Sequence, residues 1–302
     1  MKYRECYDWG CSSLKNAGIE EAALDARYLL EHICGTNRND LLVHGDRQVD
    51  ESQEALYREL IGKREQRIPL QHLTGVQEFM GLEFAVNEHV LIPRQDTEIL
   101  VEEVLKELHD GMEVLDMCTG SGCILISLLH YSNRCRGVGV DISEEALEVA
   151  RENAGRLLGG KYAQQNIPVG SLEIGHTGSQ TENADLVRFV ESDLFENVTG
   201  KYEFIVSNPP YIRSDVIPTL MPEVKDHEPM QALDGTADGL YFYRRITAES
   251  RAYLKKGGML YFEIGHDQAE DVSNIMTEAG FIEIKVVKDF AGLDRVVYGT
   301  WI

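Results

Sequence analysis

From about residue 97 onward, short apolar segments alternate with longer amphipathic ones, and this alternation limits the fold more than any other feature of the chain. Strands that alternate with helices predict a mainly parallel, doubly wound α/β sheet. Ligands of such sheets bind beyond the carboxyl ends of the strands, so the residues that follow each strand are the first candidates for a site. The expected strands are 113–116, 137–141, 187–190, 202–207, 259–264, 282–287 and 295–301.

The sequence before this region predicts a different kind of structure. Residues 1–74 carry apolar side chains at helical spacing, which predicts a small helical bundle. Turn signals and apolar residues in 75–94 predict a β-hairpin linker, and 95–302 form the α/β domain. The bundle contains no catalytic cluster, so we expect it to bind a partner. The segment 159–185 is rich in Gly, Gln, Ser, Thr and Asn, and we interpret it as a surface insertion without a chemical role.

Composition narrows the classes of partner. The 51 acidic and 29 basic residues give a net charge of -22, which disfavours binding to bare nucleic acid. No apolar run approaches the length of a membrane span, and the start of the chain has no signal-peptide pattern, so we expect a cytoplasmic protein, as a monomer. The six cysteines form no C-x-x-C pair, and no metal site is predicted.

A glycine turn connects the first predicted strand to a helix. Small residues there let a ligand approach backbone N–H groups. The turn has neither a complete G-x-G-x-x-G pattern nor a phosphate-loop lysine. The carboxylate that precedes it would repel a pyrophosphate but attract an α-ammonium or a sulfonium. The candidate cofactor-binding residues of this turn are Asp116, Cys118, Thr119, Gly120, Ser121 and Gly122.

The next two strands end in further carboxylates. Asp141 follows the second strand, where it could accept hydrogen bonds from both hydroxyls of a ribose. Asp193 follows the third strand, where it could bind an adenine amino group, with Leu194 against the ring. Each assignment is weak alone, because Asp at a strand end is often a cap or turn residue. Together they fit S-adenosylmethionine, with S-adenosylhomocysteine as product, better than NAD.

The fourth strand ends in Asn208-Pro209-Pro210-Tyr211, the candidate catalytic and substrate-binding segment. The two prolines lack the N–H that a ladder needs, so the strand must stop and expose the asparagine amide. The side-chain oxygen of Asn208 and the carbonyl of Pro209 could each accept one N–H of a planar nitrogen and orient it for methyl transfer. Pro210 would stiffen the turn, and Tyr211 could stack on the planar group. Read alone, this segment does not say whose nitrogen is methylated.

The chain resembles the protein-(glutamine-N5) methyltransferases that modify the Gly-Gly-Gln glutamine of class 1 peptide-chain release factors. The resemblance lies in Pro69–Gly75, in Leu91–Arg94 with Thr97-Glu98, in the glycine turn and in Val206–Ile212. It implies a class I S-adenosylmethionine-dependent methyltransferase, Rossmann-like, with a seven-stranded, mostly parallel sheet and a small N-terminal helical bundle. It also implies that residues 118–122, Asp141, Leu194 and Asn208 contact the cofactor, that residues 208–211 hold the substrate glutamine, and that release factors are the partners.

Three departures and three alternatives accompany this resemblance. Cys118 stands where a glycine is usual, Gln95-Asp96 replaces Pro-Glu, and the 159–185 segment is long. A glutamine methyltransferase of a ribosomal protein would share the same motifs. An adenine-N6 methyltransferase of nucleic acid could use the same Asn-Pro-Pro-Tyr geometry, although the acidic composition opposes it. A non-catalytic adaptor is the third alternative, and the intact Asn-Pro-Pro-Tyr segment argues against it.

Overall fold

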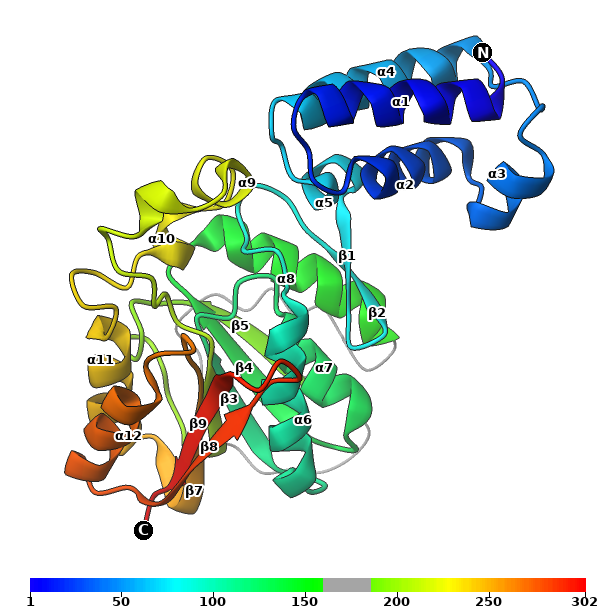
Figure 1. Cartoon of the computed structure of the whole chain (residues 1–302). Helices are drawn as coiled ribbons and strands as arrows, with labels where there is room; N and C mark the ends of the chain where they lie inside the picture. Colours follow the sequence, from blue (N-terminus) through cyan, green and yellow to red (C-terminus); the bar gives the residue numbers. More distant parts are fainter. Residues whose placement is uncertain (160–185) are drawn as a thin grey trace, which may run out of the picture. The chain divides into compact units, whose positions relative to one another are not determined.

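The computed structural model describes residues 1–159 and 186–302, which form two compact units (Figure 1). The first unit, here called the helical unit, contains Met1–Val76 and Leu220–Glu228. The second, here called the sheet unit, contains Gln77–Thr219 and Pro229–Ile302. Apart from Gly159, the insertion predicted at 159–185 lies outside the described residues. Within the described ranges, no helix has the length and apolar character needed to cross a membrane.

The helical unit packs its apolar side chains at helical spacing around one core. In α2 the buried positions include Ala22, Ala26, Leu29 and Leu30, which form one face of the helix. The ring of Tyr57 is fully buried among them, and its hydroxyl donates to the Ala26 carbonyl over 3.1 Å. The helices of this unit are α1 (Tyr3–Asn16), α2 (Ala22–Cys34), α3 (Arg38–Val43), α4 (Glu51–Glu65), α5 (Leu70–Thr74) and α9 (Pro222–Lys225).

A buried ion cluster holds α9 in the helical unit. Arg64 is 7% exposed and donates from Nε to Asp25 Oδ2 at 2.7 Å. Its Nη1 donates to Glu223 Oε1 at 3.0 Å, and Arg67 Nη1 reaches the same oxygen at 3.1 Å. The segment that carries Glu223 is thus tied to helices far away in the sequence by paired, largely desolvated charges.

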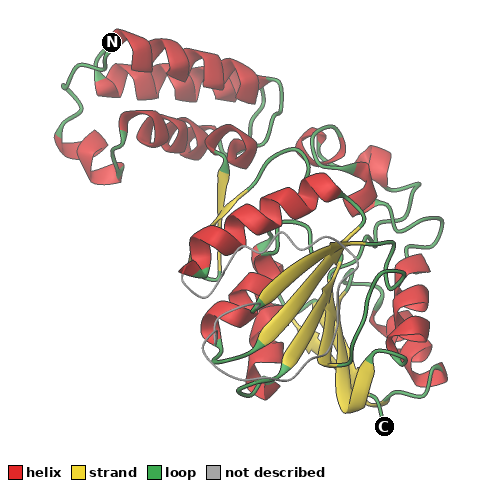
Figure 2. Ribbon diagram, turned by 180° about the vertical axis from the view of Figure 1, so that it is seen from behind, coloured by secondary structure: helices red, strands yellow, loops and turns green. Residues whose placement is uncertain are grey.

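The sheet unit contains a seven-stranded sheet in the order β5-β4-β3-β6-β7-β9-β8 (Figure 2). Neighbouring strands from β5 to β7 are parallel, and β9 is antiparallel to both β7 and β8. The predicted seven-stranded, mostly parallel sheet is therefore confirmed. Its strands are β3 (Glu113–Met117), β4 (Arg136–Asp141), β5 (Val187–Glu191), β6 (Tyr202–Ser207), β7 (Leu254–Glu263), β8 (Ile282–Lys288) and β9 (Asp294–Thr300).

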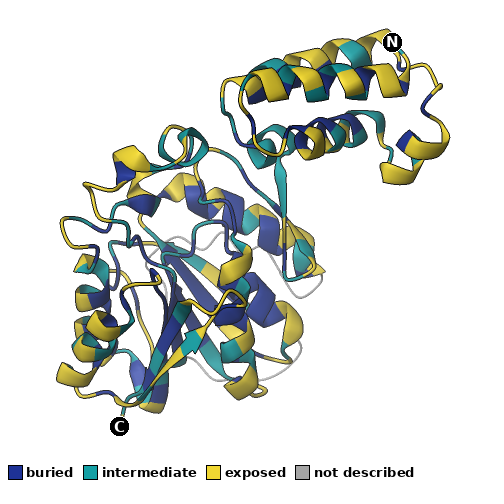
Figure 3. Cartoon of the chain, in the orientation of Figure 1, coloured by how far each residue is buried: buried dark blue, intermediate teal, exposed yellow. Residues whose placement is uncertain are grey.

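Helices cover both faces of this sheet, so its central strands are apolar on both sides. On β3, Val114 packs in the cluster beneath α6, α7 and α8, whereas Leu115 and Met117 pack in the cluster beneath α11 and α12. Figure 3 shows the resulting buried band along the strands. The remaining elements are β1 (Val76–Phe79), β2 (Leu82–Ala85), η1 (Gln95–Thr97), α6 (Glu98–Glu107), α7 (Cys123–Tyr131), α8 (Glu144–Leu157), η3 (Ile217–Thr219), α10 (Met230–Leu233), α11 (Tyr241–Ser250) and α12 (Ala269–Glu278).

The strand order reverses beside β3. Going along the chain from β3, the next strands β4 and β5 lie on one side, and β6 and β7 lie on the other. The loops that leave β3 and β6 at their carboxyl ends therefore diverge and leave a crevice between them, which is the usual ligand position in open α/β sheets.

Candidate functional site

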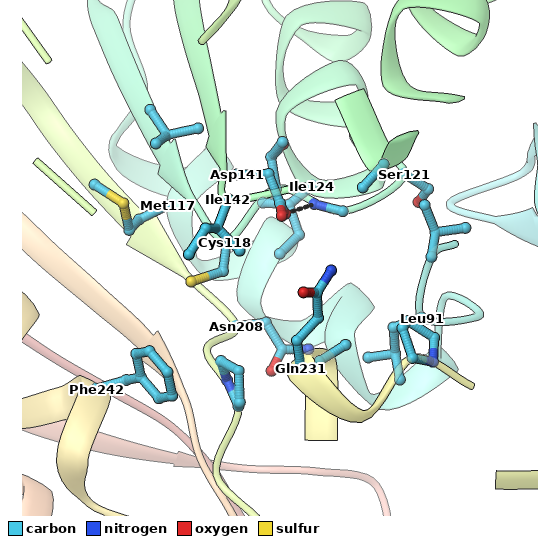
Figure 4. A pocket seen from close by; sticks show the side chains of 18 of the residues that line it. Leu91, Met117, Cys118, Ser121, Ile124, Asp141, Ile142, Asn208, Gln231 and Phe242 are labelled. Carbon is cyan, nitrogen blue, oxygen red and sulfur yellow. Dashed lines mark hydrogen bonds between the residues drawn. The ribbon is translucent and has the colours of Figure 1, made fainter. Parts of the chain in front are cut away.

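A cavity of ≈ 660 Å³ lies in the sheet unit at the carboxyl ends of β3, β4, β5 and β6 (Figure 4). This volume is in the range of cofactor and small-ligand sites. Nine of the predicted site residues line it: Cys118, Thr119, Gly120, Ser121, Asp141, Asp193, Leu194, Asn208 and Pro210. Four others do not line it in the part of the chain that the structure describes: Asp116, Gly122, Pro209 and Tyr211.

The glycine turn between β3 and α7 exposes backbone to the cavity. A Cβ added to Gly120 would meet no atom within 4 Å, so this position is open toward the ligand space. At Gly122, φ is +79° and a Cβ would lie 2.8 Å from Ile126 Cδ1, so only glycine fits there. Cys118 has a φ of 62°, a left-handed conformation that a glycine would adopt without strain. This explains why glycine is the usual residue at that position.

The Asp141 carboxylate is held in a fixed orientation at the end of β4. Its Oδ2 accepts from the Gly120 N–H at 2.9 Å, and its Oδ1 accepts from the Ser143 N–H at 3.1 Å. Each oxygen retains a second lone pair for a ligand. Burial raises the pKa of Asp141 above its ordinary value, and the two N–H donors oppose that rise. The site therefore offers an oriented, partly desolvated acceptor where a ribose was expected.

Asp116 lies behind the cavity rather than in its wall. It is fully buried on β3, and its Oδ2 accepts from the Thr119 hydroxyl at 2.6 Å. Its Oδ1 is buried without a hydrogen-bond partner among the described residues. Burial raises the pKa of Asp116 to about 7, although the Thr119 hydrogen bond lowers it. Because Thr119 lines the cavity, Asp116 can influence a ligand through that hydroxyl and through its charge.

Asp193 and Leu194 form the wall beyond β5. Asp193 Oδ1 accepts from Arg245 Nη1 on α11 at 2.9 Å, and the carboxylate is still 42% exposed. Leu194 is 4% exposed and has a φ of 50°, a conformation that branched and bulky residues rarely adopt. The chain thus holds an apolar side chain and a paired carboxylate at the place where an adenine was expected.

Asn208 lines the cavity directly after β6, whose last residue is tied to β3 by the hydrogen bond from Ser207 Oγ to the Met117 carbonyl at 2.6 Å. The Asn208 Nδ2 lies 3.5 Å from Thr97 Oγ1. Pro210 also lines the cavity. The Tyr211 carbonyl accepts from Gln268 Nε2 at 3.1 Å, which anchors the chain just after the two prolines.

Several lining residues were not identified from the sequence. Neither the four-residue helix α10 nor the loop before η1 has a local pattern that points to a ligand. Gln231 faces the cavity from α10, and Phe242 does so from α11 (Figure 4). Thr97 belongs to a segment that carried the resemblance, but its place at the cavity was not predicted. The lining residues of this group are Leu91, Pro93, Thr97, Met230, Gln231 and Phe242.

Within residues 1–159 and 186–302, no three His, Cys, Asp or Glu side chains gather in a way that could hold a metal ion. Burial raises the pKa of the Cys118 thiol, and it raises that of the Cys123 thiol to about 12. These two sulfur atoms are accordingly thiols at neutral pH and act as apolar groups in the cavity wall.

Each of the two units contains a match to a known protein family. Residues 5–75 match a family described as the PrmC N-terminal domain, and residues 108–187 match a methyltransferase domain. A protein of Clostridium acetobutylicum named release factor glutamine methyltransferase is 40% identical over 302 residues, covering 98% of both chains. A protein of the same name from Fusobacterium nucleatum is 39% identical over 289 residues, covering 94% of this chain and 75% of that protein.

The fold has a counterpart among solved structures. The crystal structure of a methyltransferase from Pyrococcus furiosus superposes with a TM-score of 0.51, covering 80% of this chain and 100% of that one. The two sequences are only 16% identical, so this similarity concerns the fold alone.

Proposed function

Since the chain belongs to the family of release factor glutamine methyltransferases, we propose that it transfers a methyl group from S-adenosylmethionine to the side-chain amide nitrogen of a glutamine in class 1 peptide-chain release factors. The observation that carries this proposal is the convergence of Asn208, Asp141 and the glycine turn on one cavity. An oriented carboxylate for a ribose and an exposed amide at a strand end are the two features that such a transfer needs.

The cavity fits the cofactor in polarity as well as in size. Asp141 supplies fixed acceptors for ribose hydroxyls, and Leu194 supplies an apolar surface for a base. The open space at Gly120 lets a ligand reach the backbone of the turn. The Asp116 carboxyl behind Thr119, whose Oδ1 has no hydrogen-bond partner among the described residues, provides negative charge for a cationic group when it is ionised. When bound, the cofactor supplies an electrophilic methyl group attached to a positively charged sulfur.

The residues of the chain then have to orient the acceptor nitrogen. An amide nitrogen is a poor nucleophile because its lone pair is delocalised into the carbonyl. Asn208 Oδ1 and the carbonyl of Pro209, which is not itself a lining residue but lies between the lining residues Asn208 and Pro210, accept its two N–H groups and turn the nitrogen toward the methyl donor. As the nitrogen becomes alkylated its remaining protons become strongly acidic, so one of them leaves through these acceptors, and no strong base is required.

The two units suggest a division of labour. The sheet unit contains every residue that lines the cavity. The helical unit matches the domain that accompanies this activity in the family, and its described residues include no cluster of catalytic side chains around a comparable cavity. We therefore propose that the helical unit contributes the docking surface for the release factor.

The test is to locate the transferred label. The protein is incubated with methyl-labelled S-adenosylmethionine together with purified release factor, ribosomal proteins and nucleic acid, and the modified residue is identified by mass spectrometry. Label on a glutamine of the release factor supports the proposal. Label on a ribosomal-protein glutamine would reassign the partner, and label on adenine would overturn the assignment of the acceptor. A release factor with this glutamine replaced by alanine is the matched control.

A further inference from the structure

A buried glutamate lies beside the Asn-Pro-Pro-Tyr segment on the neighbouring strand. Ser207 of β6 is paired with Phe262 of β7, so Asn208 and Glu263 follow at the same level on adjacent parallel strands. Glu263 is 2% exposed, and its Oε2 has no hydrogen-bond partner in the described part of the chain. A buried carboxyl with an unused oxygen is costly, so its position next to the site calls for a physical explanation.

Thr97 connects this glutamate to the site. Its side chain is buried, its hydroxyl lies 3.5 Å from Asn208 Nδ2, and hydrogen bonding from Thr97 lowers the pKa of the Glu263 carboxyl. The 3.5 Å distance between Thr97 Oγ1 and Asn208 Nδ2 is long for a hydrogen bond, as is common for catalytic contacts before the substrate binds. A hydroxyl has one proton to donate and two lone pairs with which to accept. If the hydroxyl donates its one hydrogen bond to the Glu263 carboxylate, Thr97 can only accept a hydrogen bond from the Asn208 amide.

We propose that Glu263 is a positioning residue that sets, through Thr97, which end of the Asn208 amide faces the substrate. The Thr97 hydroxyl donates its hydrogen bond to the Glu263 carboxylate, its oxygen accepts from Asn208 Nδ2, and Asn208 Oδ1 is left as the acceptor that the substrate nitrogen requires. The two ends of an amide have almost the same shape, so packing alone does not select between them. The glutamate supplies the polarity that does.

Glu263 also has a structural neighbour, and the experiment must separate the two roles. The positive charge of Arg295 acts on Glu263, and Arg295 is itself ion-paired with Asp96 and Asp289 at 3.2 Å and 3.0 Å. Burial raises the pKa of Glu263 to about 7, against the Thr97 hydrogen bond and Arg295. Measurements at pH 8 therefore keep the carboxyl ionised. Removing the Thr97 hydroxyl breaks the proposed relay and leaves Arg295 untouched.

The first measurement needs neither substrate nor cofactor. In protein labelled with ¹⁵N-asparagine, the side-chain amide signals of Asn208 are recorded in the wild type, Glu263→Gln, Thr97→Val and Thr97→Ser. We expect Glu263→Gln and Thr97→Val to shift these signals and to speed amide proton exchange, and Thr97→Ser to stay close to the wild type because it keeps the hydroxyl. Unchanged Asn208 signals in both Glu263→Gln and Thr97→Val would overturn the inference.

The second measurement is kinetic and rests on the proposed function. We expect Glu263→Gln and Thr97→Val each to lower kcat about 10- to 100-fold, with little change in KM for the cofactor, because a misdirected acceptor affects the reacting geometry. Thr97→Ser should recover most of the loss seen in Thr97→Val. The double variant should be no slower than the worse single variant, since both changes break one relay. Because a glutamine oxygen can still accept from Thr97, full kcat in both Glu263→Gln and Thr97→Val would overturn the inference.

Two control variants complete the design. Thr247→Val removes a buried hydroxyl that has no partner in the described residues, and Glu113→Gln removes a charge at the opposite end of β3. Neither should change kcat or the Asn208 signals. A wild type that does not methylate release factor would contradict the proposed function, whereas the amide signals still decide the role of Glu263.

Discussion

The buried acidic side chains of the helical unit differ in their partners from those beside the cavity of the sheet unit. In the helical unit, Arg64 and Arg67 meet Asp25 and Glu223 in direct ion pairs of 2.7 to 3.1 Å. Burial alone would raise the pKa of Glu223, but a backbone hydrogen bond and the two arginines outweigh it and hold that pKa below its ordinary value. Beside the cavity of the sheet unit, Asp116 and Glu263 are buried without an ion pair among the described residues, and each, like Glu223, keeps one oxygen without a hydrogen-bond partner there.

This difference distinguishes acidic side chains that stabilise the fold from acidic side chains that take part in a functional site. A paired buried carboxylate stabilises only as long as its partner stays, and a buried carboxyl without an ion pair costs stability until a ligand or a neighbouring group compensates it. Burial raises the pKa of both Asp116 and Glu263 to about 7. Strongly perturbed groups beside a cavity are typical of functional sites. Changes in the helical unit should therefore affect stability, and changes at the cavity should affect activity.

The largest expected effect is on the helical unit. Arg64→Met leaves Asp25 buried without its partner and removes one of two cations from Glu223, so we expect a loss of about 3 to 5 kcal/mol in the free energy of unfolding. The chain has two tryptophans, Trp9 in the helical unit and Trp301 in the sheet unit. Urea unfolding followed by Trp9 fluorescence in a Trp301→Phe background measures the change in the helical unit.

A matched control lies one residue away on α4. Lys63 is 46% exposed and pairs with Glu59 at 2.7 Å, so Lys63→Met should change the same free energy by less than about 1 kcal/mol. Cofactor affinity should be unchanged in both variants. A similar small effect for Arg64→Met would mean that the buried cluster does not stabilise the helical unit, and the contrast between the units would disappear.

The second effect is a loss of methyl transfer without a loss of stability. Asn208→Ala removes the acceptor that holds the substrate nitrogen, and we expect transfer to fall about 100- to 1000-fold, as for loss of a key hydrogen-bonding group. Cofactor affinity and Trp301-monitored stability should be largely retained. Asn133→Ala, an exposed change in the loop before β4, is the control. Near-normal turnover by Asn208→Ala would remove this residue from the reaction.

Local patterns account for what the sequence could predict. Strand β6 coincides with the predicted 202–207, because an apolar run that ends in two prolines has a defined stop. The predicted residues at the ends of β4, β5 and β6 reach one cavity, since parallel strands end at the same edge of a sheet. Asp116 could not be placed in this way. Both faces of β3 are buried, so the sequence does not show which face a given side chain occupies.

Contacts between distant segments account for what the sequence could not predict. Glu223 belongs to the helical unit through its bond to Arg64, which is 159 positions away. Thr97 and Glu263 meet because the loop before α6 reaches the carboxyl end of β7. Neither contact leaves a period or a spacing in the sequence. The first contact depends on how the chain returns to the helical unit and the second on the order of strands in the sheet, and only the structure supplies either.

The third effect is a loss of cofactor affinity when Asp141, in the wall of the cavity, is replaced. Asp141→Ala removes both oriented acceptors, and we expect cofactor binding to weaken by about 1 to 3 kcal/mol through the lost hydroxyl contacts. Calorimetry with S-adenosylmethionine measures the change directly, and Asp110→Ala, in an exposed turn before β3, is the control. Unchanged affinity would exclude Asp141 from the cofactor site, and a large loss of stability would place it with the structural acids of the helical unit.

The smallest effect is a divergence between the units with pH. Asp116 and Glu263 have ordinary pKa values of 3.8 and 4.5 and folded values of about 7, so between about pH 4.5 and pH 7 the folded sheet unit binds more protons than the unfolded chain. Its stability should therefore rise by about 1 kcal/mol as the pH falls from 7.5 to 6.5, because the two carboxyls together bind roughly one more proton in the folded state there, and one such proton changes stability by about 1.4 kcal/mol per pH unit. Glu223 has a lowered pKa, so its contribution to stability stays complete throughout this range and is lost only as the pH falls below its ordinary value of 4.5.

Trp301 in a Trp9→Phe background should report the rise, Trp9 in a Trp301→Phe background should report none, and Asp116→Asn with Glu263→Gln should flatten the Trp301 response. Parallel pH profiles from the two tryptophans would show that the buried acids of the two units do not differ in the way their contacts imply.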